Sequence, residues 1–116
     1  MKSERPKKKL KHHKTLTLEK WSRYRFCEQM ANIGSEVERT IIWKKKDEKY
    51  AGLAFERALE LIDMTRLDPK NKSRLGELCR MREIIVDWYY DNKYHSTDKS
   101  WQNYFLAFNY YARINK

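Results

Sequence analysis

Apolar residues recur every three or four positions along most of this chain, which is the spacing of one face of an α-helix. The clearest stripe consists of Phe26, Met30, Ile33, Val37 and Ile41. The alternation of apolar and polar residues that marks a half-buried strand is absent. Three glycines and two prolines are all that interrupt the 116 residues. The pattern predicts an all-α fold.

Four amphipathic segments are predicted, each bounded by capping or breaking residues. The helices are expected at about 18–46, 47–66, 73–91 and 97–115. Thr17 is a good N-cap for the first helix. Asp68-Pro69 ends the second, because proline disfavours the α conformation in the residue before it. Four helices with short connections predict an antiparallel up-down four-helix bundle.

Three residues within the helices carry specific expectations. Gly34 lies in mid-helix, where glycine costs about 1 kcal/mol relative to alanine, and this indicates the close approach of another helix. Cys27 and Cys79 lie in apolar helical patterns without a CxxC or a zinc-type spacing. We expect two reduced, buried thiols.

Residues 1–16 differ from the rest of the chain, because they are rich in lysine and almost without apolar content. The formal net charge is +10, and residues 1–20 carry +6 of it with eight Lys or Arg and two Glu. A segment of this composition cannot bury a core face. We expect a flexible lysine-rich arm over residues 1–16, followed by the bundle over residues 17–116.

The positive charge favours an anionic partner, which is nucleic acid, an acidic protein face or an anionic membrane. Flexible polybasic segments neutralise phosphates with salt-dependent, sequence-independent affinity. A membrane is disfavoured because the arm lacks the apolar face of an interfacial helix, and a merely solubilising tail is the other alternative. We expect RNA or DNA contacts, with RNA favoured, at Lys7, Lys8, Lys9, Lys11, Lys14, Lys44, Lys45, Lys46, Lys70, Lys72, Arg74 and Arg80. In an up-down bundle the arm leaves beside residues 70–74, whereas residues 44–46 form a second patch at the other end.

Residues typical of catalytic or metal sites are present without the spacing that such sites need. There is no glycine-rich phosphate loop, no Gly-x-Ser-x-Gly and no HExxH. The three histidines lie in the arm and in a predicted loop: His12, His13 and His95. Glu56 and Glu60 have a spacing that suits a metal, but solvated carboxylates with Arg57 and Arg39 as salt-bridge partners are the simpler interpretation. We expect no enzyme, no metal and no cofactor.

Aromatic residues are abundant, with four Trp, eight Tyr and four Phe. Trp88-Tyr89-Tyr90 and Tyr110-Tyr111 cannot all face one core, since adjacent helical residues point about 100° apart. Burial between subunits, ordinary core packing and base stacking are three interpretations of this surplus. The first of them favours a homo-oligomer.

The overall plan of the chain resembles a known family of four-helix bundles. The shared features are a length of about 115 residues, four helices, a basic surface and no set of catalytic residues. The family comprises the proteins encoded in 23S rRNA intervening sequences and the accessory variability determinant of diversity-generating retroelements. The resemblance spans residues 18–115 in architecture and rests on no diagnostic motif. It implies a homopentameric bundle that binds RNA or DNA and a partner reverse transcriptase.

A second, local resemblance lies in residues 50–60, which look like the second helix of a tetratricopeptide repeat. Asp68-Pro69 resembles the end of such a repeat, but no second copy follows about 34 residues away. The alternative function is therefore a helical protein–protein interaction module, antitoxin-like or tetratricopeptide-like. No apolar run approaches the roughly 18 residues of a membrane span, and no secretory signal is visible. We therefore expect a cytoplasmic protein.

Overall fold

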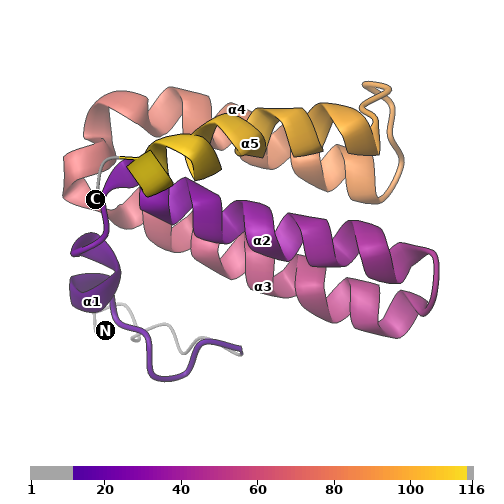
Figure 1. The fold of residues 1–116 in the computed structure, drawn as a ribbon, viewed down its shortest axis with the longest axis horizontal. Helices are drawn as coiled ribbons and strands as arrows, with labels where there is room; N and C mark the ends of the chain where they lie inside the picture. The colour runs from indigo at the N-terminus through magenta and orange to yellow at the C-terminus, as the bar shows by residue number, and fades with distance from the viewer. Residues whose placement is uncertain (1–11, 115–116) are drawn as a thin grey trace, which may run out of the picture.

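The computed structural model describes residues 12–114, and every regular element in this range is a helix. The elements are α1 (Leu18–Ser22), α2 (Phe26–Lys44), α3 (Glu48–Leu67), the 3₁₀ helix η1 (Pro69–Arg74), α4 (Leu75–Tyr89) and α5 (Asp98–Ile114) (Figure 1). The predicted all-α class is confirmed. Four residues of the predicted binding set, Lys7, Lys8, Lys9 and Lys11, lie outside the described residues.

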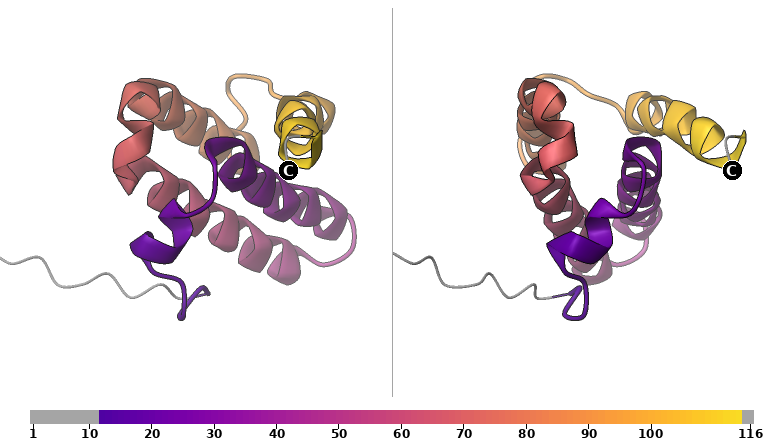
Figure 2. Two further views of the ribbon diagram at one scale, coloured as in Figure 1. Left: turned by 60° about the vertical axis from the view of Figure 1, so that its left-hand side comes forward. Right: turned by 90° about the vertical axis from the view of Figure 1, so that its left-hand side faces the viewer.

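The long helices alternate in direction along the longest axis of the molecule (Figure 1). α2 packs against both α3 and α5, and α4 packs against α3. α4 and α5 meet near their connecting loop, where the Trp88 and Trp101 ring centroids are 6.5 Å apart. The C-terminal end of α5 then lies away from α4 (Figure 2). A closed up-down bundle stays a prediction, because these two helices separate.

The apolar stripes of the long helices supply the core between them. The stripe predicted for the first helix is confirmed, since Met30, Ile33, Val37 and Ile41 are buried and Phe26 is half-buried. Its counterparts on the other helices include Phe55, Ile62, Leu78, Ile85, Trp101 and Phe105, all of them buried. Removing these side chains from water is the main force that holds the helices together.

The prediction of one continuous helix over residues 18–46 was wrong, because the chain breaks between α1 and α2. Arg25 is extended, and its N–H donates to the Glu28 carboxylate at 2.8 Å. The Trp21 carbonyl accepts from the Gln29 side chain at 3.0 Å, so it needs no further helical turn. The break turns Trp21 into the core, where its Nε1 donates to Thr65 Oγ1 at 3.0 Å.

The helix ends elsewhere follow the predictions closely. Thr17 caps α1 by accepting from the Lys20 N–H. The predicted turn at residues 68–72 is η1, with Asp68 as its N-cap, and α4 begins at Leu75 rather than at residue 73. Over residues 12–114 no helix combines the length and the apolar content that a membrane crossing needs.

The prediction for Gly34 agrees with the structure, whereas the predicted burial of both cysteine thiols does not. The close approach predicted at Gly34 is confirmed, since a Cβ built there would lie 2.7 Å from the Cβ of Phe105 on α5. Both cysteines are free; Cys27 is half-buried and Cys79 is exposed. The expectation of a buried thiol at Cys79 was wrong because Leu78, the residue before it, takes the core-facing position on α4.

Candidate nucleic-acid interface

A buried polar network fixes the end of the molecule where α1 meets η1. The Gln29 amide donates to Asp68 Oδ2 at 2.8 Å, and Asn71 Nδ2 donates to Gln29 Oε1 at 2.9 Å. Asn71 Nδ2 also donates to the Thr65 carbonyl at 3.0 Å. All four of these residues are buried. Because these buried groups are hydrogen-bonded to one another, the network holds η1 in a defined position.

Lys70, a predicted phosphate contact, belongs to this network. Its Nζ pairs with Asp68 Oδ2 and donates to the Ser22 carbonyl at 3.1 Å. Burial alone would raise the pKa of Asp68, but hydrogen bonds from Lys70 and Gln29 outweigh it and lower that pKa. Asp68 is therefore ionised at neutral pH, and it neutralises the Lys70 charge within the fold.

The other predicted cations near this end of the fold face solvent. Lys72 and Arg74 on η1 and Arg80 on α4 are exposed, and none has an ion pair within the described part of the chain. The Arg74 guanidinium lies 4.3 Å from the centre of the Phe26 ring, a cation–π contact that leaves its charge uncompensated. These three side chains are the accessible positive charge that the bundle contributes here.

The second predicted patch, at the turn between α2 and α3, lies at the opposite end of the molecule (Figure 1). Lys44 is partly engaged, since its Nζ is 4.4 Å from the Trp88 ring centre and 3.9 Å from Asp98 Oδ1. Lys45 and Lys46 are exposed. The structure therefore does not bring this patch together with the 72–80 cations.

The described root of the arm lies against α3. The His12 N–H donates to both carboxylate oxygens of Glu60, at 3.2 and 3.0 Å. The His12 and His13 rings pair with Glu56 Oε1 at 2.9 Å and with Glu60 Oε1 at 2.8 Å. The expectation of a solvated carboxylate was therefore wrong for Glu60, whose side chain is 15% exposed, whereas the Glu56 side chain is 51% exposed, as expected.

The arginines expected to pair with Glu56 and Glu60 bind elsewhere. Arg57 Nε and Arg39 Nη1 lie 3.1 and 3.0 Å from the two oxygens of the nearly buried Glu36.

Glu56 lies eleven residues before the end of α3, which is about 16 Å along the helix axis. The arm root therefore does not lie beside η1 as predicted. The element that lies beside η1 is α1, since Lys70 donates a hydrogen bond to the Ser22 carbonyl.

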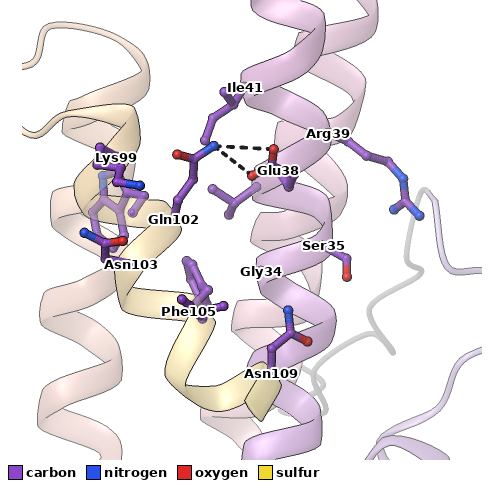
Figure 3. A pocket seen from close by; sticks show the side chains of 13 residues that line it. Gly34, Ser35, Glu38, Arg39, Ile41, Lys99, Gln102, Asn103, Phe105 and Asn109 are labelled. Atoms are coloured by element: carbon purple, nitrogen blue, oxygen red, sulfur yellow. Dashed lines mark hydrogen bonds between the residues drawn. The ribbon is translucent and has the colours of Figure 1, made fainter. Parts of the chain in front are cut away.

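A groove of about 510 Å³ runs between α2 and α5 (Figure 3). Gln102 Nε2 donates to Glu38 Oε1 across it at 3.1 Å, and Arg39 points away from it (Figure 3). Its lining includes no histidine or cysteine, and Glu38 is its one carboxylate. No group of three His, Cys, Asp or Glu within residues 12–114 is arranged to hold a metal ion. The groove is lined by a mixture of polar and apolar side chains.

No protein-family model, curated protein or solved structure matches this chain. The charges, grooves and exposed side chains of the fold itself are therefore the guide to its function.

The aromatic residues divide between core and surface, as the helical spacing predicts. Trp88 and Trp101 are buried, and the Tyr89 ring stacks on Phe55 with centroids 4.2 Å apart. Tyr90 and Tyr110 are 69% and 60% exposed. Tyrosines this exposed contribute little to the core of the described chain, which leaves them available to a partner.

The sequence analysis did not predict an exposed apolar stripe that runs along α5. Leu106, Tyr110 and Ile114 follow one another at intervals of four residues and are at least half exposed. A signal for it is present, because Asp98, Lys99 and Arg113 are the only charged residues of α5. A helix that is apolar around much of its circumference has more than one face to bury.

Proposed function

We propose that this chain is a non-catalytic nucleic-acid-binding accessory protein that contacts RNA or DNA phosphates, with RNA favoured. The observation that carries the proposal is the exposed set Lys72, Arg74 and Arg80, which has no ion-pair partner within the described residues. Lys72 and Arg74 lie on η1, which the buried network of Gln29 and Asp68 holds in place. Cations on a fixed backbone lose less conformational freedom when they meet a phosphate than cations on an unsupported loop.

Phosphate contacts make binding depend steeply on salt, because each neutralised phosphate releases condensed counterions. The test is the affinity of the full chain for a labelled single-stranded RNA over a range of salt concentrations. A variant with Lys72, Arg74 and Arg80 changed to Gln is expected to bind more weakly and to lower the salt slope by up to about 0.7 for each phosphate that is no longer neutralised. Changing Lys93 and Lys99 to Gln removes two exposed cations that lie outside the predicted binding set and is the matched control. An affinity that does not vary with salt rules out this function.

The larger assembly is part of the same proposal. Residues 17–116 pack as an antiparallel up-down four-helix bundle behind a basic arm, whose root at His12 and His13 is held on α3, and copies of the chain form a homo-oligomer in the cytoplasm. A reverse transcriptase is the partner that the family resemblance suggests. Native mass measurement of the purified particle tests the oligomer. A pull-down with and without nuclease tests whether a partner enzyme is held through nucleic acid.

The exposed stripe on α5 favours a second candidate, a helical protein–protein interaction module. Leu106 and Tyr110 are 62% and 60% exposed, and few charges surround them. Depletion of charge and enrichment of tyrosine are typical of the centre of protein interfaces. This function predicts a partner that stays bound at high salt and after nuclease treatment, and that no longer binds the Leu106→Glu variant.

A further inference from the structure

The groove between α2 and α5 and the exposed apolar stripe of α5 form one continuous surface. Leu106 belongs to both, since it lines the groove and begins the stripe that Tyr110 and Ile114 continue. These three side chains are 62%, 60% and 53% exposed. The groove extends along α5 from Lys99 to Asn109 (Figure 3). A surface that carries a hollow beside an exposed apolar row has the shape that an isologous contact needs, in which one patch packs against its own copy.

Two charged residues near opposite ends of this surface form no ion pair within the described residues. Glu38, on α2, is exposed and accepts a hydrogen bond from Gln102 at 3.1 Å across the groove. Arg113 is exposed and lies four residues after Asn109, so it continues the groove-lining face of α5 by one helical turn. Eleven residues separate Gln102 from Arg113, which is about 16 Å along the helix axis. The two charges are therefore too far apart to pair within one copy.

We propose that α5 packs antiparallel against α5 of a second copy, around a two-fold axis near Ala107, and that Arg113 of each copy pairs with Glu38 of the other. A two-fold axis across the helix exchanges its two ends, so Arg113 comes to lie over the partner's Gln102 and Glu38. Leu106 then lies near the middle of the contact, against the partner's groove. Ala107 is exposed and small, which lets the two helix axes approach closely there.

Charge favours a second copy as the occupant of this surface. The chain carries a formal net charge of +10, so two copies repel each other over much of their surfaces. Between Lys99 and Arg113 α5 has no charged residue, so contact along this length brings no like charges together. Lys99 itself is exposed, and its long stem lets the ammonium group stay in water. The antiparallel direction follows because parallel helices bring the two Arg113 side chains together.

The exposed apolar area sets the size of the contact. A large side chain that is about half exposed offers roughly 100 Å², half of what a large aromatic residue buries. Leu106, Tyr110 and Ile114 together then offer about 300 Å² per copy, and a pair of copies buries about 600 Å². Interfaces are a little over half apolar, so the total is about 1,000–1,100 Å², the lower bound for a specific interface. The dimer is therefore expected to dissociate on dilution.

This interface deepens the homo-oligomer of the proposed function, and it is tested without nucleic acid. The mass of the full-length protein is measured by sedimentation over a wide range of protein concentrations. We expect the mass to rise from that of one chain to that of two. Leu106→Glu places a charge at the middle of the contact and is expected to keep the mass of one chain at every concentration. Circular dichroism melting of each variant checks that the fold is intact.

Charge reversal tests the pairing of Arg113 with Glu38. Glu38→Arg and Arg113→Glu, each made alone, are expected to weaken association roughly two- to thirtyfold, because two symmetric ion pairs are lost. The double variant restores opposite charges and is expected to associate like the wild type. Lys49→Glu makes the same charge change as Arg113→Glu at an exposed position on α3 and is the matched control, with association expected to be unchanged.

Three results overturn the interface. The first is a wild-type mass of one chain at every concentration, which leaves the stripe open to a protein of different sequence. The second is a dimer that survives both Leu106→Glu and Glu38→Arg, since another surface then holds it. The third is a double variant that associates no better than the single ones.

The salt titration with RNA decides the proposed function separately. The Leu106→Glu variant keeps the exposed cations of η1 and α4, so it is expected to bind RNA with a steep dependence on salt. A wild-type protein that dimerises as described but does not bind RNA supports the interface and overturns the nucleic-acid function. A protein that binds RNA but stays a single chain overturns the interface and leaves the nucleic-acid function in place.

Discussion

Gly34→Ala is a sharp test of how α2 and α5 pack. The added Cβ would lie 2.7 Å from the Cβ and 2.9 Å from the Cγ of Phe105. Both are atoms near the backbone of α5, so a side-chain rotation cannot remove the clash. Phe105 is itself buried, with its ring against Tyr104 and Trp101 at centroid distances of 5.0 and 6.1 Å. The substitution therefore has to move α5 away from α2.

The magnitude follows from two opposing terms. Overpacking of this kind costs about 1–3 kcal/mol, whereas replacing a helical glycine by alanine gains about 1 kcal/mol. The expected net change is a destabilisation of about 0–2 kcal/mol. Gly52→Ala on α3 is the matched control, because its Cβ meets only the Tyr89 hydroxyl at 3.6 Å, an ordinary contact. The helix-propensity term is common to both variants, so their difference isolates the clash, at about 1–3 kcal/mol.

The assay is urea unfolding followed by helical circular dichroism, with free energies from linear extrapolation. The measured order of stability is expected to be Gly52→Ala, then wild type, then Gly34→Ala. Gly76→Ala is a second control, since nothing lies within 4 Å of its built Cβ. A Gly34→Ala protein as stable as the Gly52→Ala protein would refute the contact between Gly34 and Phe105.

Three further predictions concern the charged groups at the arm and at η1. The pKa of Asp68 is lowered below its ordinary value of 3.8, so its contribution to stability is present above that pH and is lost as the pH falls through the folded pKa. Urea midpoints measured between pH 6 and pH 2 should show this loss. In the Asp68→Asn variant the urea midpoint should depend less on pH over the same range. Lys70→Met should destabilise the fold by about 1–3 kcal/mol because it removes a partner of a buried carboxylate. Lys72→Met should instead weaken RNA binding and leave the urea midpoint unchanged. The reverse pattern would contradict the assignment of Lys70 to the fold and of Lys72 to RNA binding. Glu60→Gln should weaken the attachment of the arm root to α3, because the His12 and His13 N–H groups donate to this carboxylate. The change should be measured as faster tryptic cleavage after the exposed Lys14 and faster amide exchange at His13. Unchanged cleavage would mean that the hydrogen bonds to Glu60 do not hold the arm root.

The sequence predicted the features that depend on local spacing. The helical period identified the long helices, Thr17 marked the start of α1, and Asp68-Pro69 marked the end of α3. The contact at Gly34 was also predictable, because a mid-helix glycine is unfavourable unless something packs closely against it. Each of these signals lies within a few residues of the feature that it predicts.

Features that depend on distant partners left no such signal. The break between α1 and α2 is stabilised by Gln29 and Lys70, whose side chains donate hydrogen bonds to carbonyls of α1. Lys70 is 48 residues from the Ser22 carbonyl to which it donates. The arm root is likewise held by carboxylates 44 to 48 residues away. Periodicity describes which face of a helix is apolar, and it carries no information about such pairings.

The candidate site shows why the number of basic residues does not by itself locate an interface. Folding neutralises some of the cations on the chain's own carboxylates: Arg39 and Arg57 on Glu36, Arg66 and Arg82 on Asp63, and Lys70 on Asp68. An ion-paired cation adds little to the attraction of a phosphate, because the approaching anion also meets the carboxylate beside it. Lys72, Arg74 and Arg80 form no ion pair within the described residues, so no paired carboxylate cancels their charge. Two neighbouring lysines such as Lys70 and Lys72 look equivalent in sequence, but the buried Asp68 pairs with Lys70 and leaves Lys72 exposed and unpaired within the described residues.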